Sequence, residues 1–383
     1  MQINHTVDES HRIHARRLDM PPRLLLGPGP SNVHPRVRLA MAMNEVGHLD
    51  PCFINLMNEV QDLLRYVWQT NNPFTIPVSG TGSAAMEAAL ANTVEPGDVV
   101  LLGVNGYFGE RLCDMASRYG ADVRRLEKPW GTVFTLEEIK ASLEVHGPML
   151  LGLVHAETST GALQPMEGVG DLCREFDALL LLDTVTSLGG VPVHLDEWKV
   201  DVAYSGSQKC ISCPPGLAPL TLGDRSLAKL HARKTKVPNW YLDMSMVGKY
   251  WGSDRTYHHT APIAMNYALR EALVIIAEEG LESRWERHRR NAELLWEGLA
   301  EMGISCHVAP EIRLPSLTTA LIPPGTDGRA VGAILRDRFN IEVAQGLGQL
   351  AGKVWRIGLM GYNSRTEVVT LLLSALRKVL GRE

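Results

Sequence analysis

The sequence of 383 residues has few cysteines and no long apolar run, and both absences exclude classes of protein. Six cysteines are too few for a disulfide scaffold, so we expect reduced thiols and a cytoplasmic protein. No apolar stretch approaches the roughly 18 residues that a membrane-spanning helix needs. Residues 1–22 are polar and contain no apolar core, which argues against a secretory signal.

The chain also has no large excess of positive or negative charge. The chain has 38 Lys and Arg against 43 Asp and Glu, which gives a formal net charge of −5. This mild acidity gives no reason to bind nucleic acid or an anionic membrane. Hydrophobic residues make up 45% of the chain and charged residues 21%, values that are ordinary for a globular protein and exclude a disordered one.

Patterns typical of a metal centre are missing as well. Cys210 and Cys213 form a single Cys-x-x-Cys pair with no second pair, which makes a zinc site a poor explanation. His258 and His259 are adjacent rather than spaced along one face of an element. We therefore expect packed thiols, hydrogen-bonded histidines and no metal.

Short apolar runs alternate with helix-length segments, such as 83–93, 108–119 and 165–177. This alternation predicts an α/β fold with a seven-stranded, mostly parallel sheet. The run at 178–182 is apolar without polar alternation, so we expect both faces of the sheet to be covered. The strands are expected at 74–79, 98–104, 122–127, 149–155, 178–183, 200–205 and 218–222.

The pattern changes after Pro262, where two long helices are expected at 263–279 and 281–302. A smaller unit follows, with strands expected near 304–308, 316–322, 341–343 and 354–358 and a closing helix near 364–380. The sequence therefore predicts an N-terminal arm at 1–22, a large α/β domain at 23–282 and a small α+β domain at 283–383.

Ligands collect at the carboxyl ends of the strands in an open parallel sheet, and a glycine-rich turn falls there. Residues 80–85 follow an expected strand and begin a helix, whose free amide groups favour an anion such as a phosphate. Gly80, Gly82 and Ala85 also fit the spacing of a dinucleotide fingerprint, so a nicotinamide-dependent dehydrogenase is an alternative function. A tight turn with a capped helix is the plain structural alternative.

Three charged residues fall at comparable places. Asp183 directly follows a buried strand, where a carboxylate is costly without a cationic partner unless it serves as a helix cap. Lys209 ends the next strand and is either a solvated group or an amine nucleophile in a closed site. Arg356 lies in a short apolar strand, and its planar fork suits a carboxylate or an inter-domain salt bridge.

A phosphate cradle, an acid, an amine and a carboxylate clamp are together what pyridoxal phosphate requires. Four segments of the sequence resemble the class V, fold-type I aminotransferases of the alanine–glyoxylate and serine–pyruvate type. The resemblance runs from about residue 22 to the end, and it rests on the order and spacing of Leu26–Ser31, Ser79–Gly82, Ser205–Lys209 and Tyr257–Thr260.

The resemblance implies a catalytic pair, in which Lys209 holds pyridoxal 5'-phosphate as a Schiff base and Asp183 pairs with the ring nitrogen. Arg356 is expected to bind the substrate carboxylate. The remaining cofactor contacts that it implies are Thr81, Gly82, Ser83 and Gln208 at the phosphate, Phe108 and Val185 on the two ring faces, Thr158 near the ring hydroxyl, and Tyr257 and Thr260 at the phosphate of a partner subunit. Relatives often carry Trp at the position of Phe108 and His at that of Ser83.

The same resemblance implies a homodimer with shared active sites and an N-terminal arm that lies over the partner. It implies ping-pong transamination of alanine or serine with glyoxylate or pyruvate, and most directly alanine–glyoxylate transamination. The single carboxylate clamp favours small donors, unless Arg111, Arg233 or Lys236 supplies a second cation. Serine–glyoxylate transamination, another fold-type I reaction such as cysteine desulfuration, and a binding protein without activity are the alternatives.

Overall fold

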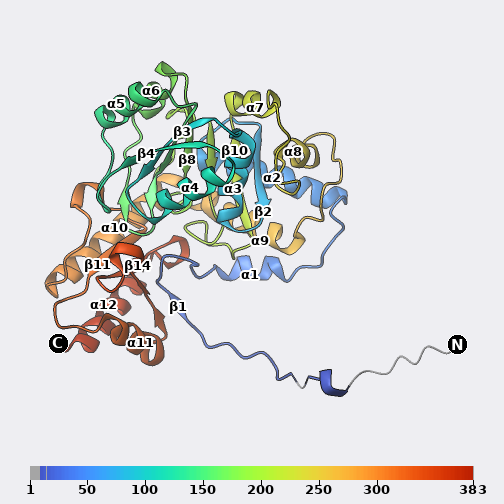
Figure 1. Ribbon diagram of the computed structural model, residues 1–383. Coiled ribbons are helices and arrows are strands. Elements are labelled where there is room, and N and C mark those ends of the chain that lie inside the picture. The colour runs from blue at the N-terminus through green and yellow to red at the C-terminus, as the bar shows by residue number, and fades with distance from the viewer. Residues whose placement is uncertain (1–8, 14, 383) are drawn as a thin grey trace.

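The computed structural model describes residues 9–13 and 15–382, and a seven-stranded sheet forms its centre (Figure 1). The order across the sheet is β2-β10-β9-β8-β5-β3-β4. β10 runs antiparallel to both of its neighbours, and the other neighbouring pairs are parallel. The predicted α/β fold with a mostly parallel sheet is therefore confirmed. The strands are β2 (Phe74–Ser79), β3 (Val99–Val104), β4 (Asp122–Glu127), β5 (Leu150–Val154), β8 (Leu179–Asp183), β9 (Val202–Tyr204) and β10 (Leu217–Leu222).

Helices cover both faces of this sheet, as the apolar run of β8 predicts. Leu180 and Leu182 point into one core, whereas Leu179 and Leu181 point into the other. The first core contains side chains from α2 (Pro51–Trp68), α5 (Leu136–His146), α6 (Val169–Glu175) and α9 (Ile263–Glu279). The second contains side chains from α3 (Gly82–Thr93), α4 (Tyr107–Arg118), α7 (Asp224–His231) and α8 (Met244–Trp251).

Helix α6 is shorter than the expected segment 165–177. Gly168 before it and Asp177 after it have φ values of 81° and 50°. Both values lie in the left-handed region, so neither residue can continue a right-handed helix.

The C-terminal unit has a three-stranded sheet in the order β11-β14-β13. The expected strand at 304–308 is wrong, because only Cys306 forms a bridge there, to Ala320, before the chain turns at Pro310. The elements of this unit and its neighbours are α10 (Leu281–Glu301), η2 (Pro310–Ile312), β11 (Leu317–Leu321), α11 (Gly328–Phe339), β12 (Ile341–Glu342), β13 (Ala344–Gln345), η3 (Gly348–Leu350), β14 (Val354–Gly358), η4 (Gly361–Asn363) and α12 (Thr366–Leu380).

The start of the described chain packs with this C-terminal unit. Strand β1 (Leu24–Leu25) pairs in parallel with β12, and Leu26 is buried in the C-terminal core. Residues 24–26 belong to the predicted large domain but pack with the C-terminal unit. The predicted division of the chain at residue 282 stays a prediction. The chain then enters α1 (Pro35–Met41), which packs on α9.

The described part of the N-terminal arm holds one short helix, η1 (Glu9–His11), which lies apart from the body of the molecule, and the chain then extends toward β1 (Figure 1). Residues 1–8 and 14 of the expected arm lie outside the described residues. Within the described residues, no helix combines the length and the apolar character that crossing a membrane requires.

Candidate active site

A cavity of about 150 Å³ lies where β2, β3, β8 and β9 end. Eight of the residues that the sequence singles out for the cofactor lie in its wall, beside Met86, which was not expected there, and Arg111, which was offered only as a possible second cation. Thr158, Tyr257, Thr260 and Arg356 are not in this wall. The eight are Thr81, Gly82, Ser83, Phe108, Asp183, Val185, Gln208 and Lys209.

The turn between β2 and α3 gives the cavity one end suited to an anion. Gly80 has a φ of 150°, and Thr81 is the N-cap residue of α3 but makes no side-chain cap hydrogen bond. The first amide groups of α3 therefore lack a side-chain partner, at the positive end of the helix dipole. Gln208 Oε1 is buried nearby without a hydrogen-bond partner among the described residues.

Asp183 ends β8 with its carboxylate in the cavity wall and is 2% exposed. Its Oδ1 accepts from the backbone N–H of Val185 (2.8 Å), and its Oδ2 accepts from the hydroxyl of Tyr204 (2.9 Å). Burial raises the pKa of Asp183 to about 7, although both hydrogen bonds oppose this shift. A cation bound in the cavity would keep this carboxylate ionised.

Lys209 is 9% exposed and lies under the loop that begins at Leu26. Its Nζ donates to the carbonyl of Pro28. A Cβ on Gly29, whose φ is 105°, would lie 2.6 Å from Lys209 Cδ, so a side chain there would strain the backbone and displace the end of the lysine. Burial, with a smaller effect from Arg356, lowers the pKa of Lys209 to about 8. A usable fraction of the amine is therefore unprotonated near neutral pH.

Arg356 reaches toward the site from β14 of the C-terminal unit and is 6% exposed. Its Nε donates to the carbonyl of Gln345 (2.9 Å), and its Nη1 donates to the carbonyl of Thr158 (3.3 Å). No described acceptor takes a hydrogen bond from Nη2. Burial lowers the pKa of Arg356 to about 10, so the guanidinium stays charged at neutral pH.

Glu157 is a site residue that the sequence reasoning missed. Its carboxylate is fully buried and accepts from the backbone N–H of Phe108 (3.1 Å) and from the N–H and hydroxyl of Ser159 (2.9 and 2.6 Å). These bonds join the start of α4 to the segment that carries Thr158. A glutamate among hydroxyl residues directly after a predicted strand was the available signal. Tyr204, which supports Asp183, gave no signal beyond its place at a strand end.

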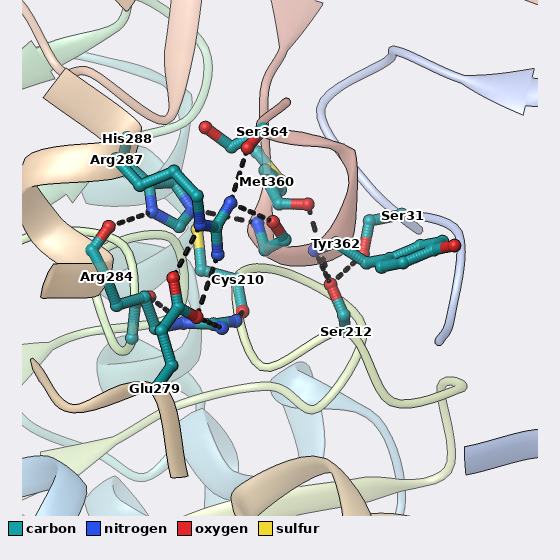
Figure 2. A network of polar contacts seen from close by, with 12 residues as sticks. Ser31, Cys210, Ser212, Glu279, Arg284, Arg287, His288, Met360, Tyr362 and Ser364 are labelled. Atoms are coloured by element: carbon teal, nitrogen blue, oxygen red, sulfur yellow. Dashed lines mark hydrogen bonds and ion pairs between the residues drawn. The ribbon is translucent and has the colours of Figure 1, made fainter. Parts of the chain in front are cut away.

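A buried polar network lies behind Lys209 and joins the two units of the chain (Figure 2). Arg284 donates to the carbonyl of Cys210 (2.6 Å) and to Glu279 (2.7 Å). His288 Nδ1 contacts the carbonyl of Arg284 (2.7 Å), while its Nε2 accepts from Gly361 N–H (2.9 Å). A neutral imidazole satisfies both contacts, and burial lowers the pKa of His288 to about 3. The network thus fixes the peptide after Lys209 relative to the unit that carries Arg356.

The cysteines beside Lys209 do not suit nucleophilic chemistry. Cys210 and Cys213 are fully buried, and burial raises the pKa of both thiols. They are packed thiols, as expected. His259 contacts Ser79 Oγ (2.8 Å) through Nε2 and His258 through Nδ1 (2.8 Å), so the histidine pair is hydrogen-bonded, also as expected.

The sequence model of the family described as "Aminotransferase class-V" matches residues 37–371. The chain belongs to the class-V aminotransferase family. A rat protein (Rattus norvegicus) named alanine–glyoxylate aminotransferase is 45% identical over 96% of this chain and 89% of its own length. The crystal structure of an alanine–glyoxylate aminotransferase from Nostoc sp. has a TM-score of 0.97 and 63% identity, covering 98% of this chain and 100% of its own. A ureidoglycine–glyoxylate aminotransferase from Bacillus subtilis has a TM-score of 0.94 and 43% identity, covering 96% and 95%.

Class-V aminotransferases depend on pyridoxal phosphate, and this aminotransferase therefore uses that cofactor. The nicotinamide interpretation of Gly80, Gly82 and Ala85 is wrong. The residues of the cavity fit this cofactor. The N-terminus of α3, which has no side-chain cap, lies at one end of the cavity. The amine of Lys209, with its lowered pKa, and the buried carboxylate of Asp183 also line the cavity.

The two cofactor contacts expected from a partner subunit lie elsewhere on this chain. Tyr257 is 56% exposed and contacts the ring of His48 (5.1 Å between centroids), and Thr260 is exposed. Neither side chain lines the cavity of its own chain. Their expected contact with a partner's cofactor stays a prediction.

We expect Asp183 to make the stability of the cofactor-free aminotransferase depend on pH. The folded chain binds the proton of this carboxyl more tightly than the unfolded chain, because the pKa rises from 3.8 to about 7. Stability from this group is therefore present below about pH 4 and is lost as pH rises toward 7. Asp183→Asn should raise the Tm of the cofactor-free chain at pH 8 and change it little at pH 4.

Asp114→Asn is the matched control, since Asp114 is exposed and pairs with Arg118 on the surface. It should shift the Tm little at either pH. A variant Asp183→Asn that is less stable than the wild type at pH 8 would contradict the raised pKa.

Proposed function

We propose that this aminotransferase transfers the amino group of alanine to glyoxylate. The observation that carries the proposal is the arrangement of Lys209 and Asp183 in one cavity at the N-terminus of α3. The choice of substrates is supported by the relatives from rat and Nostoc sp., which are named alanine–glyoxylate aminotransferases. The conversion is expected to be ping-pong, because one cavity must accept both substrates in turn.

When bound, pyridoxal phosphate supplies an aldehyde that condenses with amines and a ring that withdraws electrons from the carbon being deprotonated. Asp183 is suited to hold a proton on the ring nitrogen, since its buried carboxylate is otherwise expensive to ionise. Tyr204 and Val185 fix its two oxygens, so the carboxylate does not need to reorient during the reaction.

Lys209 is the group that moves the proton. Its Nζ is proposed to take the α-proton of the amino acid and to return a proton to the adjacent carbon. The lowered pKa of about 8 leaves part of the amine unprotonated, which this role requires. The loop at Pro28 and Gly29 covers the side chain and limits the space in which the amine can swing.

Arg356 is proposed to bind the α-carboxylate of each substrate. Its hydrogen bonds to Gln345 and Thr158 hold the guanidinium plane, which leaves Nη2 for an incoming carboxylate. Two of the possible second cations lie elsewhere. Arg233 donates to the carbonyls of Asn92 and Val94, and Lys236 is exposed. Their placement supports a small, uncharged donor side chain.

Replacing the amine should stop the reaction. Lys209→Ala is expected to lower kcat by at least about 10⁴-fold, because among the described residues no other lysine lines the cavity to move the proton. Turnover of alanine with glyoxylate and the covalent attachment of cofactor after borohydride reduction measure the two roles of the amine. Lys199→Ala, at an exposed surface lysine, serves as control. Near-native turnover by Lys209→Ala would show that the role is assigned to the wrong residue.

The clamp role of Arg356 predicts a different profile. Arg356→Lys should raise the KM for alanine by about 10- to 100-fold, because a point charge cannot replace the planar fork. The dissociation constant of the cofactor should change by less than about threefold. Equal losses of cofactor and substrate affinity would speak against the clamp.

A panel of donors tests the substrate directly. Alanine, serine, (S)-ureidoglycine and aspartate should be compared with glyoxylate and with pyruvate as acceptors, using kcat/KM. Alanine with glyoxylate is expected to be the best pair, and aspartate the poorest donor. Serine–glyoxylate or serine–pyruvate transamination is the first alternative. Ureidoglycine–glyoxylate transamination is the second, and the relative from Bacillus subtilis supports it. A clear preference for either donor would replace alanine in the proposal.

We also propose that the active unit is a cytoplasmic homodimer. Trp240 and Tyr257 are 59% and 56% exposed, which is unusual for aromatic side chains and supports a partner surface there. Arm residues 9–13 and 15–20 are exposed and lie apart from the body in Figure 1, and the arm is proposed to lie over that partner. The cytoplasmic location is supported by the cysteines, all of which are free thiols.

A further inference from the structure

Arg111 is a cavity residue that has no assigned contact with the cofactor so far. It lies on α4, one turn after Phe108, and lines the same cavity as Lys209. Its Nη1 donates to Ser83 Oγ (3.1 Å), and its guanidinium lies 4.8 Å from the centre of the Phe108 ring. The side chain therefore reaches from the ring-stacking position to the first turn of α3.

This guanidinium has no acidic partner among the described residues. Arg118 and Arg125, in contrast, both pair with carboxylates near the same helix. A half-buried cation without a counter-ion is unfavourable, unless an anion binds beside it. Its position beside Ser83 indicates where that anion would lie, which is at the uncapped N-terminus of α3.

A phosphate monoester carries between about −1.5 and −2 charges at neutral pH, and a helix N-terminus offers only about +0.5. About one negative charge thus remains to be balanced. Lys209 also lines the cavity as a cation, but the hydrogen bond of its Nζ goes to the carbonyl of Pro28, whereas Arg111 donates to Ser83 at the start of α3. Arg111 is left as the cation at the phosphate end.

We propose that Arg111 is the counter-ion of the cofactor phosphate. The hydroxyl of Ser83 accepts from Arg111, so its own hydrogen is free to be donated to the phosphate. The stacking of the guanidinium on Phe108 also ties the phosphate end of the cavity to the ring position. The inference rests on the proposed cofactor site and adds to it a residue that the sequence offered only as a possible contact for an acidic substrate.

The test compares ligands with and without a phosphate on the cofactor-free, full-length chain in phosphate-free buffer. Quenching of tryptophan fluorescence gives the dissociation constants of pyridoxal phosphate and of pyridoxal. Competition by inorganic phosphate against pyridoxal phosphate is measured in parallel. Arg111→Met removes the charge and keeps the length, Arg111→Lys keeps a point charge, and Arg118→Met is the matched control on the exposed face of α4.

Arg111→Met should weaken pyridoxal phosphate by about 10- to 100-fold, the range of a lost charge-assisted hydrogen bond, and pyridoxal by less than about twofold. Inorganic phosphate should compete at least about tenfold less well. Arg111→Lys should fall between Arg111→Met and the wild type, because lysine binds phosphate as a point charge. Arg118→Met should match the wild type.

Equal weakening of both ligands would overturn the proposal, since Arg111 would then act only through Phe108. Unchanged affinity for pyridoxal phosphate would also overturn it. If Arg111→Met also lost its activity with acidic amino donors, Arg111 would be assigned to binding the substrate side chain. Pyridoxal binding shows within the same experiment that each variant has a folded site. If the wild-type chain failed to bind pyridoxal phosphate, the proposed function itself would fall, which is a distinct result.

Discussion

The chemistry of this aminotransferase depends on a carboxylate that is held out of water at the end of β8. The apolar strand and the helices on both faces of the sheet bury Asp183, and Tyr204 and Val185 fix its two oxygens. Burial raises its pKa to about 7, so a cationic ring nitrogen is the partner that this position favours. The same enclosure lowers the pKa of Lys209, which makes a base of a residue that is ordinarily charged. One physical cause, removal from water, thus prepares both catalytic groups.

The second requirement is that groups from two units of the chain keep a fixed relation. Arg356 comes from the C-terminal sheet, whereas Lys209 follows β9 of the central sheet. Arg284 and His288 join the peptide after Lys209 to the turn at Gly361 through buried hydrogen bonds (Figure 2). Buried polar groups of this kind are stable only when all of them are paired. The network therefore holds the clamp and the amine in register.

Much of the fold could be predicted from local sequence, because strands buried on both faces are short continuous apolar runs, as in β8. The strand expected at 304–308 failed because this mixed polar and apolar segment lies beside the edge strand β11 and forms only the bridge from Cys306 to Ala320. The glycine-rich turn, Asp183 and Lys209 could be found because they follow strand ends. The roles of Glu157 and Arg111 were harder to predict, although Glu157 follows an expected strand and Arg111 was offered as a second cation, since each role depends on which helix starts beside the residue. Only the folded chain shows that Glu157 accepts a hydrogen bond from the backbone of Phe108 and that Arg111 has no acidic partner among the described residues.

The pairing of β1 with β12 has a consequence for biosynthesis. The loop over Lys209 begins at Leu26, next to a strand whose only partner in the described chain is formed by Ile341 and Glu342. During translation that strand lacks this partner until Ile341 and Glu342 have left the ribosome, more than 300 residues later in the chain. The loop can therefore close over Lys209 only after β12 has been made, and until then it adds nothing to the burial that lowers the pKa of the amine.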